Sequence, residues 1–154
     1  MKALWRISGH NDLEGLGGER ADGRWHRAAR GKRIVYLSEH PALALIETLV
    51  NLKGDPGLFP DTYQLLKVLA TEDVSTSVWS LESLADTWRD DVSQTQSVGD
   101  SWLADGSSAL LAVPSIPSPE SMNYLFNPLH PEANQMRIDW CKRVAYDKCL
   151  FRIS

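Results

Sequence analysis

The segment from Pro41 to Leu52 constrains the fold most, because Glu47 is the only charged residue in an otherwise nearly continuous apolar run. Ser38 or His40 can cap a helix here, and a proline suits its first turn. A helix that is hydrophobic all round is normally buried. Since a buried carboxylate is costly unless it is paired or hydrogen-bonded, we expect Glu47 to be a functional group. A structural ion pair with an arginine is the alternative.

Apolar runs of strand length are the next signal along the chain. Strands favour β-branched and aromatic residues, and four runs meet this description. One further segment, 80–88, has the pattern of a short helix. The predicted strands cover residues 3–8, 34–38, 65–70 and 109–113.

Three further segments lack such a pattern. Glycines in 9–23 predict a flexible loop that can approach a ligand closely, and the prolines of 117–131 predict another loop. The tail 136–154 fits one or two strands, or a helix around Trp140. Strands interleaved with few short helices indicate a single α+β domain over residues 1–154, which is long enough to bury a core.

Composition narrows the classes of partner. A net charge of −4 argues against nucleic acid or an anionic membrane as the main partner, although basic residues cluster between Arg20 and Arg33 and could hold a small anion. No run approaches the length of a membrane span and no signal peptide is visible, so we expect a cytoplasmic protein. Cys141 and Cys149 lack zinc-like spacing, which predicts free, buried thiols and no metal site.

Other polar residues fall near the ends of the predicted elements. Arg24 follows the glycine loop, and Tyr36 lies in the middle of a strand, where a tyrosine is usually a core residue with its hydroxyl satisfied. Ser115 follows a buried strand, where a structural cap is the simpler interpretation. Asn123, Asn127 and His130 lie in a proline-rich stretch, which is typical of turns.

The order of these residues resembles the signature of RES-domain proteins. That family is named for an Arg, a Glu and a Ser, best matched here by Arg24, Glu47 and Ser115. The resemblance covers the chain from Trp5 to at least Pro131. The motifs that carry it are Gly17-Gly18, Gly23-Arg24-Trp25, Val35-Tyr36-Leu37-Ser38 before Glu47, Val98-Gly99-Asp100-Ser101-Trp102-Leu103, Val113-Pro114-Ser115 and Asn127-Pro128-x-His130-Pro131.

The resemblance implies both a fold and an activity. The fold is a small split sheet of the diphtheria-toxin ADP-ribosyltransferase type with an NAD+ cleft. The activity is that of a toxin from a type II toxin–antitoxin pair, which degrades NAD+ by hydrolysis or phosphorolysis. One alternative is ADP-ribosylation of a protein such as phosphoribosyl pyrophosphate synthetase, and another is an inactive module that only binds its antitoxin. The implied antitoxin is an Xre-like protein with a DUF2384 (MbcA/ParS) domain.

The chemistry of NAD+ cleavage suggests a role for each candidate. Glu47 would stabilise an oxocarbenium-like ribose, and Arg24, or Arg6 as second choice, would bind pyrophosphate. Tyr36 would stack on nicotinamide. Neutral hydrogen bonds to ribose or amide would come from Ser115 and Asn127. Two segments without readable motifs, 53–61 and 75–96, are the candidates for recognising the acceptor.

Overall fold

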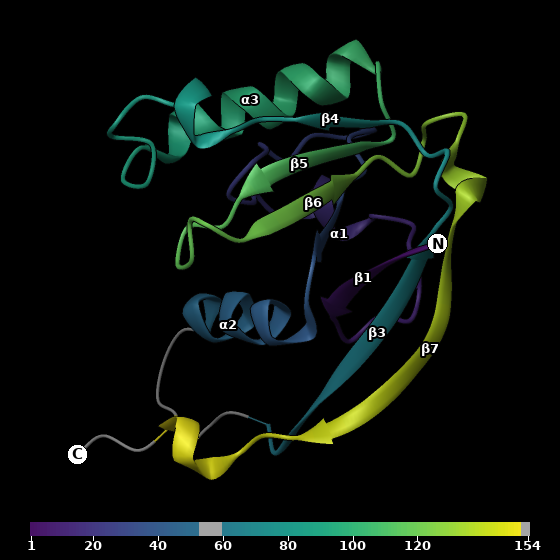
Figure 1. The fold of residues 1–154 in the computed structure, drawn as a ribbon, viewed down its shortest axis with the longest axis vertical. Helices are drawn as coiled ribbons and strands as arrows, with labels where there is room; N and C mark the ends of the chain where they lie inside the picture. The colour runs from purple at the N-terminus through teal and green to yellow at the C-terminus, as the bar shows by residue number, and fades with distance from the viewer. Residues whose placement is uncertain (53–59, 152–154) are drawn as a thin grey trace.

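The structure is a computed structural model that describes residues 1–52 and 60–151. Within these residues the chain forms strands, three α-helices and several short 3-10 turns (Figure 1). The strands outnumber the helices and pair in a mostly antiparallel sheet, as expected for an α+β domain. The elements are β1 (Lys2–Ile7), α1 (Gly17–Arg20), β2 (Val35–Ser38), α2 (Pro41–Asn51), β3 (Thr62–Ala70), β4 (Thr76–Val78), η2 (Leu81–Ser83), α3 (Val92–Asp105), β5 (Leu110–Pro114), β6 (Met122–Phe126), η3 (Ala133–Gln135), β7 (Met136–Ala145) and η4 (Lys148–Phe151).

The strands form one sheet in the order β4-β5-β6-β2-β1-β3-β7. Neighbours are antiparallel except β4 and β5. β1 meets β2 through a single residue pair, Trp5 and Ser38, whereas β1 pairs with β3 along its whole length. The sheet therefore splits between β1 and β2: Figure 1 shows β5 and β6 crossing its upper part, while β3 and β7 curve away below. This confirms the expected α+β domain with a split sheet.

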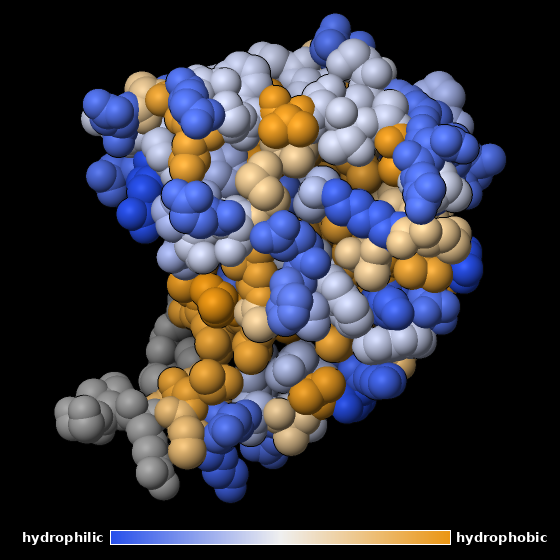
Figure 2. Space-filling model, in the orientation of Figure 1, coloured by the Kyte–Doolittle hydropathy of each residue, from blue (hydrophilic) through white to orange (hydrophobic). Residues whose placement is uncertain are grey.

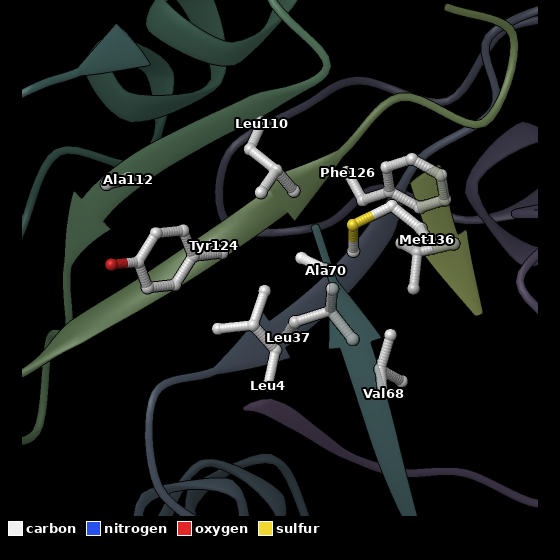
Figure 3. Packing of buried hydrophobic residues seen from close by; sticks show 10 residues of the cluster. Leu4, Leu37, Val68, Ala70, Leu110, Ala112, Tyr124, Phe126 and Met136 are labelled. Carbon is white, nitrogen blue, oxygen red and sulfur yellow. The ribbon is translucent and has the colours of Figure 1, made fainter. Parts of the chain in front are cut away.

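Hydrophobic cores cover both faces of the sheet. Side chains alternate from Ile34 through β2, so that Val35 and Leu37 enter one core while Ile34 enters the other. The first core continues across the split through Leu4 and Val68, which holds the two parts of the sheet together (Figure 3). The second core lies under α3 and contains the tryptophans Trp25, Trp88 and Trp102.

Helix α2 begins and ends close to the predicted residues. Its N-terminus is capped by His40, whose Nδ1 accepts a hydrogen bond from the Ala42 backbone N–H, and proline occupies the first turn. The expectation that the helix is buried all round is wrong. Ile46 and Val50 are 41% and 57% exposed, and Figure 2 shows apolar atoms gathered at this place on the surface. The helix packs against β1 and β2 through one face only, because it lies beside the split between these strands.

Helix α3 was not predicted from the sequence. Asp91 caps its N-terminus by accepting a hydrogen bond from the Gln94 backbone N–H. Gly106 ends it with a φ of 66°, the left-handed conformation that favours glycine. Its apolar positions are few, which hides it from a search for hydrophobic periodicity, although both caps are readable. None of the helices in the described ranges has the length and apolar character required to cross a bilayer.

Two segment predictions need correction. Residues 117–131 are not only a loop, because they contain β6, whose backbone pairs with β2 on one side and β5 on the other. Residues 80–88 do not form a helix beyond η2. They continue as turns that anchor themselves in the second core through Leu84 and Trp88. The sequence shows these two large apolar side chains, but burying them does not require a helix.

The tail forms a strand, and both cysteines lie at the surface. Residues 136–145 form one long strand, β7, which pairs with β3 and excludes the alternative of a helix around Trp140. The two thiols are free as expected, but both are exposed and not buried. Cys141 lies on β7, the last strand of the sheet, and Cys149 lies in η4, so neither position reaches the core.

Candidate functional site

A cavity of about 770 Å³ opens where the sheet splits. Its wall includes Trp5 and Ser38, the one residue pair that joins β1 to β2. Helix α2 contributes Glu47, and the loop after α1 contributes Arg24. The break in strand pairing is thus what makes room for a ligand beside the carboxylate that the sequence singles out.

Glu47 is held by neutral hydrogen-bond donors. Ser115 Oγ donates to Glu47 Oε1 at 2.6 Å, and Asn123 Nδ2 donates to the same oxygen at 2.8 Å. Among the described residues no lysine or arginine forms an ion pair with Glu47, so the alternative of a structural ion pair is wrong for this part of the chain. The carboxylate remains partly exposed to the cavity. Its charge is therefore solvated by the protein without being neutralised, and it remains available to a ligand.

Tyr36 lines the cavity and is fixed by its hydroxyl. Its Oη accepts a hydrogen bond from the Trp25 backbone N–H at 3.1 Å and lies 2.7 Å from His26 Nδ1. His26 Nε2 lies 2.9 Å from the Gly18 carbonyl oxygen, which can only accept. We therefore assign the Nε2–H tautomer, in which Tyr36 donates to Nδ1. Burial raises the pKa of the Tyr36 hydroxyl, with the Trp25 N–H opposing and Asp100 reinforcing that shift, so the tyrosine is neutral at physiological pH.

The backbone around Arg24 is held by hydrogen bonds from α3. Thr95 Oγ1 donates to the Arg24 carbonyl oxygen at 2.5 Å, and Gln96 Nε2 donates to the Gly23 carbonyl oxygen at 3.0 Å. The guanidinium donates through Nη2 to the Arg89 carbonyl oxygen. Its Nε is buried and has no hydrogen-bond partner within the described residues. An unsatisfied buried donor costs about 1–3 kcal/mol, so the protein leaves part of the hydrogen-bonding capacity of Arg24 unused.

Arg6 also lines the cavity, from β1. Its Nη1 donates to the Asp12 carbonyl oxygen at 3.0 Å. Burial lowers the pKa of the Arg6 guanidinium and the Asp12 carboxylate raises it in part, but an arginine stays charged throughout the physiological range. Two cationic side chains, Arg6 and Arg24, and two carboxylates, Asp22 and Glu47, therefore share the cavity. The described residues contain no group of three or more His, Cys, Asp or Glu side chains able to hold a metal ion.

The structure separates the remaining candidates. Ser115 is fully buried and reaches Glu47, but it is not part of the cavity wall. Asn127 is also absent from that wall, and its Oδ1 accepts from the Leu129 backbone N–H in a turn. His130 shapes the same loop by accepting from the Glu132 backbone N–H, as the simpler interpretation predicts. Of the basic cluster, Arg27 pairs with Asp100 and is used structurally.

Comparison with known proteins decides the family. The RES domain matches residues 3–147, nearly the whole chain. The chain belongs to the RES domain family. It is 43% identical over 135 residues to the protein named Toxin Res of Pseudomonas putida strain KT2440, covering 88% of this chain and 90% of that one. It is 31% identical over 160 residues to the Prs ADP-ribosylating toxin of Sphingobium sp. strain YBL2, covering 97% of both.

A solved structure shares the fold of this RES domain. It is a chain from the crystal structure of the M. tuberculosis MbcT–MbcA toxin–antitoxin complex, with a TM-score of 0.75. The alignment covers 97% of this chain and 86% of that chain, at 17% sequence identity. Similarity at this level of identity concerns the fold and supports the split-sheet architecture described above.

Three structural roles in the site of this RES domain were not predicted from the sequence. His26 fixes Tyr36, Asn123 holds Glu47, and α3 holds the Arg24 loop. The helix was detectable from its capping residues, Asp91 and Gly106. The roles of His26 and Asn123 depend on contacts between distant segments, for which a single sequence contains no signal.

Proposed function

We propose that this RES domain is the toxin of a bacterial toxin–antitoxin pair and that it cleaves the nicotinamide–ribose bond of NAD+. The observation that carries the proposal is the placement of Glu47. Its carboxylate is hydrogen-bonded by Ser115 and Asn123, is not neutralised by any described basic side chain, and faces a cavity that also contains Arg24 and Tyr36. Pockets of about 300–1,000 Å³ are typical of small-molecule and cofactor sites, and this one lies within that range.

The proposed reaction follows from these groups. The C1′–N bond breaks and its electron pair leaves on the nicotinamide nitrogen, which becomes neutral. Positive charge then develops on the ribose, where the Glu47 carboxylate stabilises it electrostatically. The pyrophosphate is assigned to Arg24, which lines the cavity and forms no ion pair with a described acidic side chain, with Arg6 as a second cation. Tyr36 presents its ring to the cavity while its hydroxyl is occupied, which suits stacking on nicotinamide.

Two kinds of acceptor for ADP-ribose are compatible with this reaction, a small molecule or a protein side chain. Water or phosphate as nucleophile gives NAD+ degradation, which is our first proposal. A protein side chain gives ADP-ribosylation, and the named activity of the Sphingobium relative, aligned over 97% of both chains, favours this as the second candidate. Of the two segments expected to recognise an acceptor, residues 53–59 lie outside the described residues. Segment 75–96 provides Val92 and Gln96 to the cavity wall.

The partner is proposed on the same grounds. The similar fold comes from a toxin–antitoxin complex, and two relatives carry the name Toxin Res. We assign this chain an antitoxin of the Xre-like type with a DUF2384 domain, acting in the cytoplasm where NAD+ is available. An inactive antitoxin-binding module is the remaining candidate, and the intact arrangement of Arg24, Glu47 and Ser115 argues against it.

The deciding experiment is product analysis with labelled NAD+ and purified protein. Free ADP-ribose or its phosphorylated form supports degradation, and label on a protein supports transfer. Glu47→Gln keeps the size of the side chain and should abolish turnover with little change in thermal stability. Glu120→Gln, an exposed position, is the matched control and should behave as wild type. Turnover of NAD+ by Glu47→Gln at the wild-type rate would show the assignment of Glu47 to be incorrect.

A further inference from the structure

The two oxygens of the Glu47 carboxylate have different surroundings. Both hydrogen bonds to it, from Ser115 Oγ and Asn123 Nδ2, end on Oε1. Oε2 accepts none from the described residues. We propose that Asn123 is a positioning residue that anchors Oε1 together with Ser115, so that Oε2 is the oxygen presented to the substrate. This inference rests on the proposed function, because it specifies which atom of Glu47 acts on NAD+.

A positioning residue is needed because of the torsional freedom of glutamate. The terminal torsion of a glutamate is broad and roughly two-fold, so a single hydrogen bond to one oxygen leaves the carboxylate plane free to rotate. Two donors approach Oε1 from different elements, Ser115 from the end of β5 and Asn123 from β6. Together they define the plane of the group, and a well-placed group on a rigid element is what catalytic geometry requires.

The orientation of the Asn123 amide is itself fixed. Ser38 Oγ donates to Asn123 Oδ1 at 2.8 Å. Ser38 and Asn123 are direct partners in the pairing of β2 with β6, so their side chains leave the same face of the sheet. A flipped amide would direct Nδ2 at Ser38 and Oδ1 at the carboxylate, which would place two acceptors against each other. The carboxylate therefore determines that Asn123 donates to it through Nδ2, and the Ser38 hydroxyl holds the amide in that orientation through Oδ1.

The main test replaces the donor with a group that donates only when protonated. Asn123→Asp has nearly the same shape, and the neighbouring Glu47 raises the pKa of the introduced carboxyl group by repulsion between like charges. At acidic pH the protonated group can still donate to Oε1. As the pH rises it ionises and repels Glu47. The other charged or titratable side chains of the cavity wall, Arg6, Asp22, Arg24, His26 and Tyr36, are the same in variant and wild type.

The expected result is a change in pH profile. The ratio of variant kcat to wild-type kcat should fall by about tenfold per pH unit above the pKa of the introduced group, with KM for NAD+ much less affected. A ratio that stays constant between pH 5 and 8 would overturn the proposal, because a merely structural asparagine would give a uniform loss. Asn134→Asp, at an exposed position in η3, is the matched control and should show no such change.

A second variant protects the test against misfolding of the first. Ser38→Ala leaves Asn123 in place but removes the hydrogen bond that holds its amide from the side opposite Glu47. The kcat should fall by about 10- to 100-fold, the range for a misplaced catalytic group. Ser38→Ala with wild-type kcat would contradict the proposed role of Ser38 and Asn123.

The orientation can also be measured without turnover. In NMR spectra the Asn123 side-chain amide hydrogens should exchange slowly with solvent in wild type and faster in Ser38→Ala and Glu47→Ala, while those of Asn134 stay unchanged. This measurement separates the proposed function from the positioning role of Asn123. If wild type does not consume NAD+, the proposed function fails, and the amide exchange still decides whether Asn123 anchors the carboxylate. If wild type consumes NAD+ and Asn123 exchanges at the same rate in all three proteins, the positioning role fails.

Discussion

Gly99 of α3 lies directly against the backbone of Trp25. A β-carbon on Gly99 would sit 1.6 Å from the Trp25 carbonyl oxygen and 2.7 Å from its carbonyl carbon. This contact brings the helix against the loop that carries Arg24. Thr95, Gln96 and Asp100, on the same side of the helix, add their hydrogen bonds to that loop. The geometry of the cationic side of the cavity thus depends on a helix that contributes little of the wall itself.

Gly99→Ala should destabilise the protein and reduce NAD+ binding. The added methyl group meets backbone atoms, which cannot rotate away, so the loop and the helix must move apart. Overpacking of this kind costs about 1–3 kcal/mol, occasionally more. Urea unfolding measures the loss of stability, and calorimetry with NAD+ in a Glu47→Gln background measures binding without turnover. Gly9→Ala is the control, because nothing lies within 4 Å of its added methyl group. Equal stability of the two variants would contradict the packing argument.

Asp100→Asn should destabilise the protein in a pH-dependent manner. Burial alone would raise the pKa of Asp100, but hydrogen bonds from the Arg27 backbone, Lys32 and the Arg27 side chain outweigh it, so the pKa is lowered. The ionised form is therefore stabilised by folding, and its contribution is present at neutral pH and lost as the pH falls through the folded-state pKa. We expect the free energy of unfolding of wild type to exceed that of the variant by about 1–2 kcal/mol at pH 7. The difference should shrink below about pH 4.

Urea unfolding from pH 7 down to pH 3 checks this expectation. Asp73→Asn, at an exposed position, serves as the control and should track wild type throughout. A difference between Asp100→Asn and wild type that is constant over the whole range would show that the carboxylate charge is not what holds Arg27 and Lys32.

The sequence was sufficient to predict the elements that carry the main site residues. The Tyr36 strand and the helix with Glu47 follow from local signals, namely β-branched content, a capping histidine and a proline in the first turn. The order of short motifs indicated the family and hence the split sheet. Local pattern was misleading where tertiary pairing decides the outcome, as in β6, whose asparagine and flanking prolines are typical of a loop but whose backbone pairs on both sides.

The role of Ser115 illustrates what a sequence cannot supply. Its residue type and position suggested a ligand-binding hydroxyl or a structural cap. In the structure it is fully buried and bonds to Glu47, 68 residues away along the chain. Such a partner is defined by the tertiary fold alone and has no counterpart in spacing or periodicity. The same holds for His26 and Tyr36, whose side chains hydrogen-bond although they lie 10 residues apart in the chain.

Ser115→Ala should lower kcat more than it changes KM. It removes one of the two donors to Glu47 Oε1 and leaves the Ser118 backbone N–H without its acceptor. Loss of carboxylate orientation should reduce kcat by about 10- to 100-fold. Steady-state kinetics of NAD+ consumption gives both constants. Ser118→Ala is the control, since its hydroxyl contacts Ser121 and not Glu47. An unchanged kcat in Ser115→Ala would mean that this hydrogen bond does not orient the carboxylate.

Tyr36→Phe should separate the two roles of this tyrosine. The substitution keeps the ring but leaves the Trp25 N–H and His26 Nδ1 without their partner, so stability should fall by about 1–3 kcal/mol. Because burial raises the pKa of the Tyr36 hydroxyl, ionisation of the tyrosine does not contribute to that loss from pH 6 to 9. If the ring stacks on nicotinamide, the affinity for NAD+ should stay close to that of wild type.

Tyr36→Leu supplies the contrast, because it removes the ring as well as the hydroxyl. Aromatic stacking contributes about 0.5–1.5 kcal/mol beyond area burial, so NAD+ should bind roughly two- to tenfold more weakly to Tyr36→Leu than to Tyr36→Phe. Calorimetry in the Glu47→Gln background measures both affinities without consuming the ligand. Tyr63→Leu, in β3 and outside the cavity wall, controls for loss of a partly exposed aromatic residue and should bind NAD+ as wild type does. Equal affinities for the two Tyr36 variants would assign Tyr36 to holding the glycine loop through His26 and not to contact with the substrate.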